Sequence, residues 1–208
     1  MLWLDVLHVL DSAFPTGAYV HASGLESLAP RDLQTALELR LEESIGRLDL
    51  VFLLHAYHDD LVELDQLLHA SLLVREPREA SSAVGTSLLR SVCDSLPEQR
   101  LTTFLAQSTH HHQAVTFGAV ACALDMEPEL AAQAYAFNSA RALISAAQRL
   151  GWIGQRVAQR TLHGLKPSCV AAASQATRMT LEEAGAFAPL WDLASMRHEH
   201  ASARMFAS

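Results

Sequence analysis

The sequence has 208 residues, which is long enough for one domain with a sizeable hydrophobic core. Hydrophobic residues make up 50% of the chain and aromatic residues only 6%, so we expect a core built mainly from alanine and leucine. The formal net charge of −8 argues against nucleic acid and against an anionic membrane surface as partners. Charged residues reach only 18%, which indicates that some apolar surface is reserved for a partner or for self-association.

The cysteine pattern and the absence of a long apolar run indicate the cellular compartment in which we expect the protein. The three cysteines include no CxxC pair, which argues against a disulfide framework or a zinc site and favours a reducing cytoplasm. The opening residues lack the basic region of a signal peptide, and no run reaches the length of a membrane span. We therefore expect a cytoplasmic protein without a membrane segment.

The N-terminal part predicts a first helix over Leu2–Leu10, followed by a corner over residues 14–26. Pro15 and Gly17 break the first helix, and a second helix is expected to run to about Leu28. Gly24 is expected to lie inside that second helix, where glycine costs stability relative to alanine. A glycine at such a position indicates the close approach of another backbone or of a ligand.

Asp32 is a plausible N-cap for a long helix from Leu33 to about His58, whose single apolar stripe is typical of a central packing element. The charged residues 75–79 predict a break, and the helix after Pro77 is expected to expose a small, polar face that includes Gly85. Thr180 and Glu183 form a capping-box pattern. No stretch shows strand alternation, so we predict an all-α, single compact domain of about ten helical segments, which spans residues 1–208 and has an Ala/Leu-rich core.

Three adjacent histidines, at positions 110–112, precede an apolar helix. On a helix, neighbouring side chains point about 100° apart, but in an extended segment His110 and His112 could share one face. A chelating pair alone is a weak metal signal, because a full site needs three or four ligands. The alternative is a helix N-terminus capped by Ser108 or Thr109.

Two stretches at opposite ends of the chain resemble motifs of the urease accessory protein UreF family. In the N-terminal corner the matching residues are Pro15, Gly17, Tyr19, His21, Gly24, Leu25 and Glu26. At the end of the chain they are Ser195, His198, Glu199, Ser202, Arg204, Phe206 and Ser208, with Met205 in place of the usual leucine and Ala207 in place of a basic residue. His112, Phe117 and Gly118 also fall on family positions, so the resemblance covers nearly the whole chain.

The resemblance implies a cytoplasmic urease maturation factor that forms a homodimer. Such a chain binds the accessory protein UreD, also called UreH, and recruits the GTPase UreG for delivery of nickel to apo-urease. GTP hydrolysis then belongs to the GTPase. Nickel is cargo of the complex, and no cofactor is expected to be bound stably by this chain.

The chain shows no nucleophile elbow and no P-loop, which agrees with a protein that is not an enzyme. We expect residues 199–208 to form a partner-binding tail, separate from a second contact patch around residues 19–26, although the tail could instead dock on its own domain. Glu26 could meet the GTPase or a buried arginine of this chain. The candidate contact residues are Tyr19, His21, Glu26, Arg197, His198, Glu199, Arg204, Met205, Phe206 and Ser208.

Two alternatives remain open at this stage. The chain could be a nickel-binding metallochaperone that uses His110 and His112, with His21 as a further candidate ligand. It could also activate the GTPase without touching metal, in which case Arg197 or Arg204 would supply an arginine finger.

Overall fold

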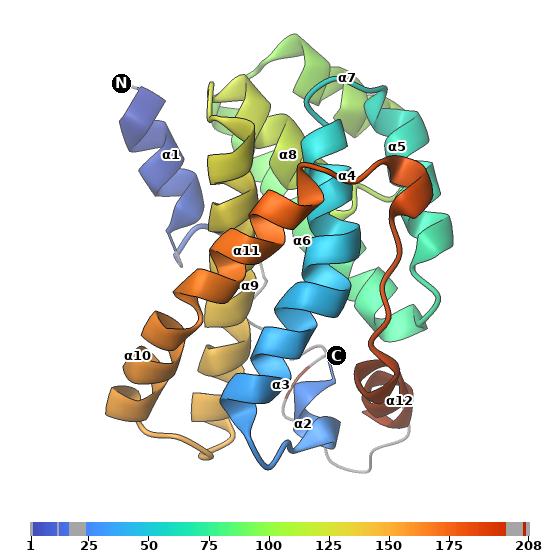
Figure 1. Ribbon diagram of the computed structural model, residues 1–208. Helices are drawn as coiled ribbons and strands as arrows, with labels where there is room; N and C mark the ends of the chain where they lie inside the picture. The colour runs from blue at the N-terminus through green and yellow to red at the C-terminus, as the bar shows by residue number, and fades with distance from the viewer. Residues whose placement is uncertain (1, 12, 17–23, 199–205, 207–208) are drawn as a thin grey trace.

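The computed structural model describes residues 2–11, 13–16, 24–198 and 206, and helices account for all the regular structure in this part of the chain (Figure 1). The predicted all-α fold is confirmed, and buried side chains from nearly every helix form one hydrophobic cluster. None of the helices in the described ranges is long and apolar enough to cross a membrane. The elements are α1 Leu2–Leu10, α2 Leu25–Leu28, α3 Leu33–Arg40, η2 Leu41–Asp49, α4 Leu50–His55, α5 Leu61–Ser71, α6 Arg75–Ser95, α7 Gln99–Gln107, α8 Gln113–Ala123, α9 Pro128–Arg149, α10 Gln155–Gly164, α11 Lys166–Ala176, η3 Leu181–Glu183 and α12 Pro189–His198.

A continuous helical rod made of α3, η2 and α4 runs through the centre of the molecule (Figure 1, blue to cyan). Asp32 caps its start, as predicted, by accepting hydrogen bonds from the backbone N–H groups of Gln34 and Thr35. In α4 the four residues 50–53 are all buried, because α8, α9 and α11 surround this end of the rod. The rod is therefore the central packing element that its apolar stripe predicts.

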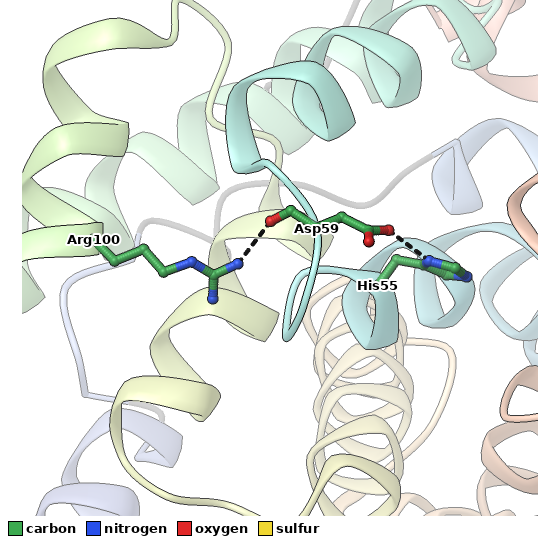
Figure 2. A network of polar contacts seen from close by, with 3 residues as sticks. All are labelled: His55, Asp59 and Arg100. Atoms are coloured by element: carbon green, nitrogen blue, oxygen red, sulfur yellow. Dashed lines mark hydrogen bonds and ion pairs between the residues drawn. The ribbon is translucent and has the colours of Figure 1, made fainter.

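The rod ends at His55, three residues before the predicted end, in a turn held by polar contacts (Figure 2). His55 Nδ1 lies 2.7 Å from Asp59 Oδ2, and the Arg100 guanidinium donates to the backbone carbonyl of Asp59 at 2.8 Å. Since Arg100 belongs to α7, this contact also fixes α7 against the end of the rod.

The middle of the rod is π-helical over nine residues, Leu41–Asp49, which the sequence did not predict. Nine residues make two and a half turns of an α-helix, so Arg40 and Asp49 would point to opposite sides. A π-turn holds roughly 4.4 residues, and two such turns bring the same pair to one side. Both side chains accordingly line the same cavity of about 510 Å³, together with Ser44, Ile45 and Leu48.

A short strap, residues 184–188, links η3 to α12 and is hydrogen-bonded to the π-helical segment. The N–H of Gly185 donates to the Arg47 carbonyl at 3.0 Å, and the N–H of Phe187 donates to the Glu43 carbonyl at 2.9 Å. Before the strap, the predicted capping box is present between Thr180 and Glu183. The strap thus sets the direction in which α12 leaves the rod.

Two predicted features of α6 are wrong. The helix begins at Arg75, so residues 75–79 are its first turn, and Pro77 is tolerated there because first-turn N–H groups have no partner inside the helix. The face that carries Gly85 is covered rather than exposed. A methyl group on Gly85 would overlap the backbone carbonyl of His111, so glycine is needed for this close approach.

Candidate partner-binding surfaces

The N-terminal motif and the C-terminal helix meet in the structure, at Gly24 and Ser195. Gly24 immediately precedes α2 with φ of 80°, so its predicted place inside the helix is wrong. A Cβ on Gly24 would lie 2.9 Å from the Ser195 backbone nitrogen, which confirms the predicted close approach of another backbone. Gly24 belongs to the expected N-terminal patch, and Ser195 lies four residues before the expected tail, so α2 packs directly against α12 where the two motifs meet.

Of the candidate contact residues, Glu26 lies half-buried in the first turn of α2, and Arg197 is exposed near the end of α12. His198 is the last residue of α12, but its side chain lies outside the described part of the structure. Also outside the described residues are Tyr19, His21, Glu199, Arg204, Met205 and Ser208.

Phe206, which we expected to contact a partner, lies buried against its own domain, the alternative left open for the tail. Its side chain is 4% exposed, and the Arg149 guanidinium carbon lies 4.2 Å from its ring centroid, a cation–π contact. Arg149 ends α9, so this residue of the tail packs on its own domain. As placed, Phe206 stabilises the fold and is not available for direct contact with a partner.

The side of η2 that faces α9 and α12 carries a polar cluster that the sequence analysis missed. The Arg40 guanidinium lies 5.2 Å from the Trp191 ring centroid, and the Tyr135 hydroxyl donates to Asp49 at 3.4 Å. Burial raises the pKa of Asp49 to about 6, although Arg40 and the hydrogen bond from Tyr135 both oppose this shift. Burial likewise raises the pKa of Asp192, and the positive charge of Arg40 partly offsets this shift.

This cluster anchors α12, because Arg40 comes from the rod while Trp191 and Asp192 come from α12. No sequence signal pointed to it, because with α-helical periodicity Arg40 and Asp49 fall on opposite sides. Only the π-helical turns make them neighbours.

The histidines 110–112 do not begin a helix capped by Ser108 or Thr109, as one reading predicted. The buried carboxylate of Asp65 accepts hydrogen bonds from the Ser108 hydroxyl and from the backbone N–H groups of His111 and His112, the latter two at 2.8 and 2.6 Å. This contact holds His111 in the left-handed region, with φ of 52°. A signal existed in the sequence, since Asp65 falls on the buried side of α5 together with Leu61, Leu64 and Leu68.

His110 and His112 do lie on one side of the loop, and α5 adds His69 to them. The rings of His69 and His110 are stacked with centroids 3.6 Å apart and planes 13° apart, and His69 Nδ1 lies 3.0 Å from His112 Nε2. A metal ion bound by an imidazole nitrogen lies in the ring plane, so two rings stacked face to face, whose planes are separated, cannot share one ion in this arrangement. No group of three or more His, Cys, Asp or Glu side chains is arranged to hold a metal among the residues that the structure describes.

Burial dominates the electrostatics of the loop. Burial lowers the pKa of His112 to about 4, although the charge of Asp65 opposes this shift. Burial also lowers the pKa of His69, and the neighbouring His110 lowers it further. The imidazoles of His69 and His112 are therefore neutral at pH 7 and pack as aromatic rings. In this arrangement the loop joins α5, α6 and α8.

Comparison with known proteins identifies the family. The UreF family model matches residues 29–166. The urease accessory protein UreF of Paenarthrobacter aurescens is 33% identical over 99% of this chain and 97% of its own length, and that of Arthrobacter sp. (strain FB24) is 32% identical over 99% and 96%. The urease accessory protein F of rice, Oryza sativa subsp. japonica, is 31% identical over 96% of this chain and 83% of its own length. On this evidence the chain belongs to the UreF family of urease accessory proteins.

Proposed function

We propose that this chain is a cytoplasmic, non-catalytic adaptor of urease maturation. It binds the accessory protein UreD and recruits the GTPase UreG for GTP-dependent insertion of nickel into apo-urease. The observation that carries the proposal is full-length similarity to proteins named urease accessory protein, at 33% identity over 99% of the chain. In this role residues 1–208 act as one unit, as a homodimer, and nickel is cargo rather than a resident cofactor.

The geometry supports an adaptor in two ways. Gly24 and Ser195, one residue from each family motif, pack against each other where α2 meets α12, so the two motifs fix the surface that these helices present. The core behind that surface is filled by close-packed alanine and leucine, as in α9, where Ala131, Ala132, Ala136 and Ala147 are fully buried. Such a core holds the surface rigid, and a rigid partner can bias a nucleotide-dependent state through different affinities for its two forms.

The test is reconstitution in a urease-producing bacterium that lacks its own UreF. Expression of this chain should restore urease activity and nickel content, and UreD should co-purify with the chain. Urease that fills with nickel to the same extent without the chain would refute the proposal. Removal of residues 201–208 is a poor probe, because it also removes the buried Phe206.

Two further measurements separate the alternatives. Calorimetric titration with Ni²⁺ of the wild type and of a His110→Ala/His112→Ala variant tests the metallochaperone, which requires tight stoichiometric binding that the variant loses. Single-turnover GTP hydrolysis by UreG tests the activating role, and the exposed Arg197 is the described candidate for an arginine finger. An adaptor that only assembles the complex predicts unchanged hydrolysis for Arg197→Ala at saturating concentrations.

A further inference from the structure

Positive charge is concentrated in one part of this acidic chain. Residues 130–181 hold six of the chain's 15 lysine and arginine residues and none of its 23 aspartate and glutamate residues. This run covers most of α9 and all of α10 and α11, so the acidic residues lie on the other helices. The net charge of −8 therefore combines a positively charged part of the chain with a strongly negative remainder.

Within this run, exposed cations gather on one side of α10. Arg156, Arg160 and His163 are exposed, and spacings of four and three residues place them on the same side of the helix. The opposite side of α10 is buried and packs on α9. Trp152, in the turn directly before α10, is 38% exposed, and Val157 is 40% exposed. We call these five residues the α10 patch.

The arginines of the α10 patch have no counter-charge within the described part of the chain. Neither Arg156 nor Arg160 makes an ion pair or a side-chain hydrogen bond to another described residue. Arg75 on α6, by contrast, lies 3.4 Å from the Glu79 carboxylate one turn later. The positive charge of the α10 patch is therefore directed at solvent and is available to a partner.

The positions of these charges do not favour the helix that carries them. Arg156 lies in the first turn of α10, where the helix dipole disfavours a cation and where the helix has no acidic residue. Arg160 lies four residues later, at the spacing where like charges repel. Carboxylates brought by a partner would relieve both effects, which indicates that the arginines serve a contact outside the chain.

The charge pattern also indicates the chemistry of that partner. Two copies of the α10 patch facing each other across a twofold axis would repel, which argues against a symmetric dimer through α10. A nucleic acid would meet only this short basic stretch and would be repelled by the acidic remainder of the chain. An acidic protein face fits, because arginine binds carboxylates through two hydrogen bonds, and arginine and tryptophan often carry the binding energy of protein interfaces.

We propose that the α10 patch binds an acidic face of another maturation protein, with carboxylates of that face paired to Arg156 and Arg160 and with Trp152 as an apolar anchor. The inference rests on the proposed function, because the proteins used to test it are those of urease maturation. Figure 1 shows α10 and α12 at opposite lower sides of the molecule with α3 between them, so the α10 patch is separate from the surface where the two family motifs meet.

The test measures the affinity of the full-length chain for purified UreD, UreG and apo-urease, each separately, by biolayer interferometry at low and high salt. Arg160→Glu should weaken the binding of one of the three proteins at least about tenfold at low salt, because a carboxylate then faces carboxylates. The charge-conserving Arg160→Lys should keep most of that affinity. Arg90→Glu is the matched control: Arg90 is exposed on α6, and its reversal changes the net charge equally but should leave all three affinities unchanged.

The salt dependence gives a second readout. The affinity of the wild type for that protein should fall as salt rises, and Arg160→Glu should remove most of this dependence, because salt screens charges at an exposed contact. The variants should keep the wild-type melting temperature, since the altered side chains are exposed. Should Arg160→Glu be destabilised, Arg156→Gln/Arg160→Gln takes its place, with the same expected direction.

The possible contrary results are distinct. Equal affinities of the wild type and Arg160→Glu for all three proteins overturn the inference and leave the proposed function intact. An equal loss in Arg90→Glu shows a general effect of net charge and also overturns it. Self-association in light scattering, or binding of a DNA duplex, that Arg160→Glu abolishes while the three affinities stay unchanged assigns the patch to a second copy or to nucleic acid and overturns it as well. Absence of any binding of the wild type to the three proteins refutes the proposed function, and the inference with it.

Discussion

The buried carboxylate of Asp65 offers the sharpest test of how this fold is held together. It accepts three hydrogen bonds, two of them from the backbone N–H groups of His111 and His112. Asparagine has nearly the same shape but only one acceptor oxygen, so Asp65→Asn leaves one of these buried donors facing an amide N–H. An unsatisfied buried donor costs about 1–3 kcal/mol, and loss of the charge weakens the remaining bonds. We expect the free energy of unfolding to fall by about 3–4 kcal/mol.

Urea denaturation followed by circular dichroism measures this loss. The control is Glu63→Gln, which neutralises an exposed carboxylate on the same helix and should change stability by no more than about 0.5 kcal/mol. Asp65→Asn should also speed amide hydrogen exchange at the start of α8, where the loop ends. A loss below about 1 kcal/mol, or one equal to that of Glu63→Gln, would show that the loop is held by apolar packing and that the reasoning is wrong.

Three further predictions concern single positions. The folded-state pKa of Asp49, about 6, lies above its ordinary value of 3.8, so the folded chain holds this proton more tightly. Wild-type stability relative to Asp49→Asn should therefore fall as pH rises from 4 to 6, by at most about 3 kcal/mol, in urea titrations at each pH. Gly85→Ala should destabilise by about 2 kcal/mol or more, despite alanine's higher helix propensity, whereas Gly185→Ala, whose methyl would meet open space, should not; melting curves compare the two. Glu26→Lys places a positive charge in the first turn of α2 and should cost about 1 kcal/mol; an unchanged melting temperature with lost UreG binding would instead assign Glu26 to the GTPase contact.

Features that depend on neighbouring residues could be predicted from the sequence. Asp32 as a cap, the capping box at Thr180 and the helix Leu2–Leu10 follow from rules that act within one turn. The apolar stripe of the rod also correctly predicted its central position, because a long helix buries its single apolar side against other helices.

Features that depend on distant residues could not be predicted in this way. The histidine loop takes its shape from Asp65, more than forty positions earlier, and without that carboxylate Ser108 does look like a helix cap. The π-helical segment does not follow the period of 3.6 residues per turn that helix patterns assume. The pairing of Arg40 with Asp49 could therefore not be predicted. Phe206 was predicted to contact a partner because phenylalanine is enriched in interfaces and chain ends are usually mobile, whereas its buried side chain packs against Arg149 of its own domain.

The orientation of α12 links the π-helical segment to the surface that a partner would meet. Either side of α12 could have faced inward, and the burial of Trp191 under Arg40 decides between them, since an aromatic side chain removes more apolar area from water than a leucine does. Leu190 and Leu193 consequently stay in solvent, where each forgoes much of the roughly 1.5–3 kcal/mol that full burial provides. Because Arg40 lies directly before η2, and η2 also supplies the Glu43 and Arg47 carbonyls that hold the strap, a change that converts η2 to regular α-helix should alter how α12 packs on the rod.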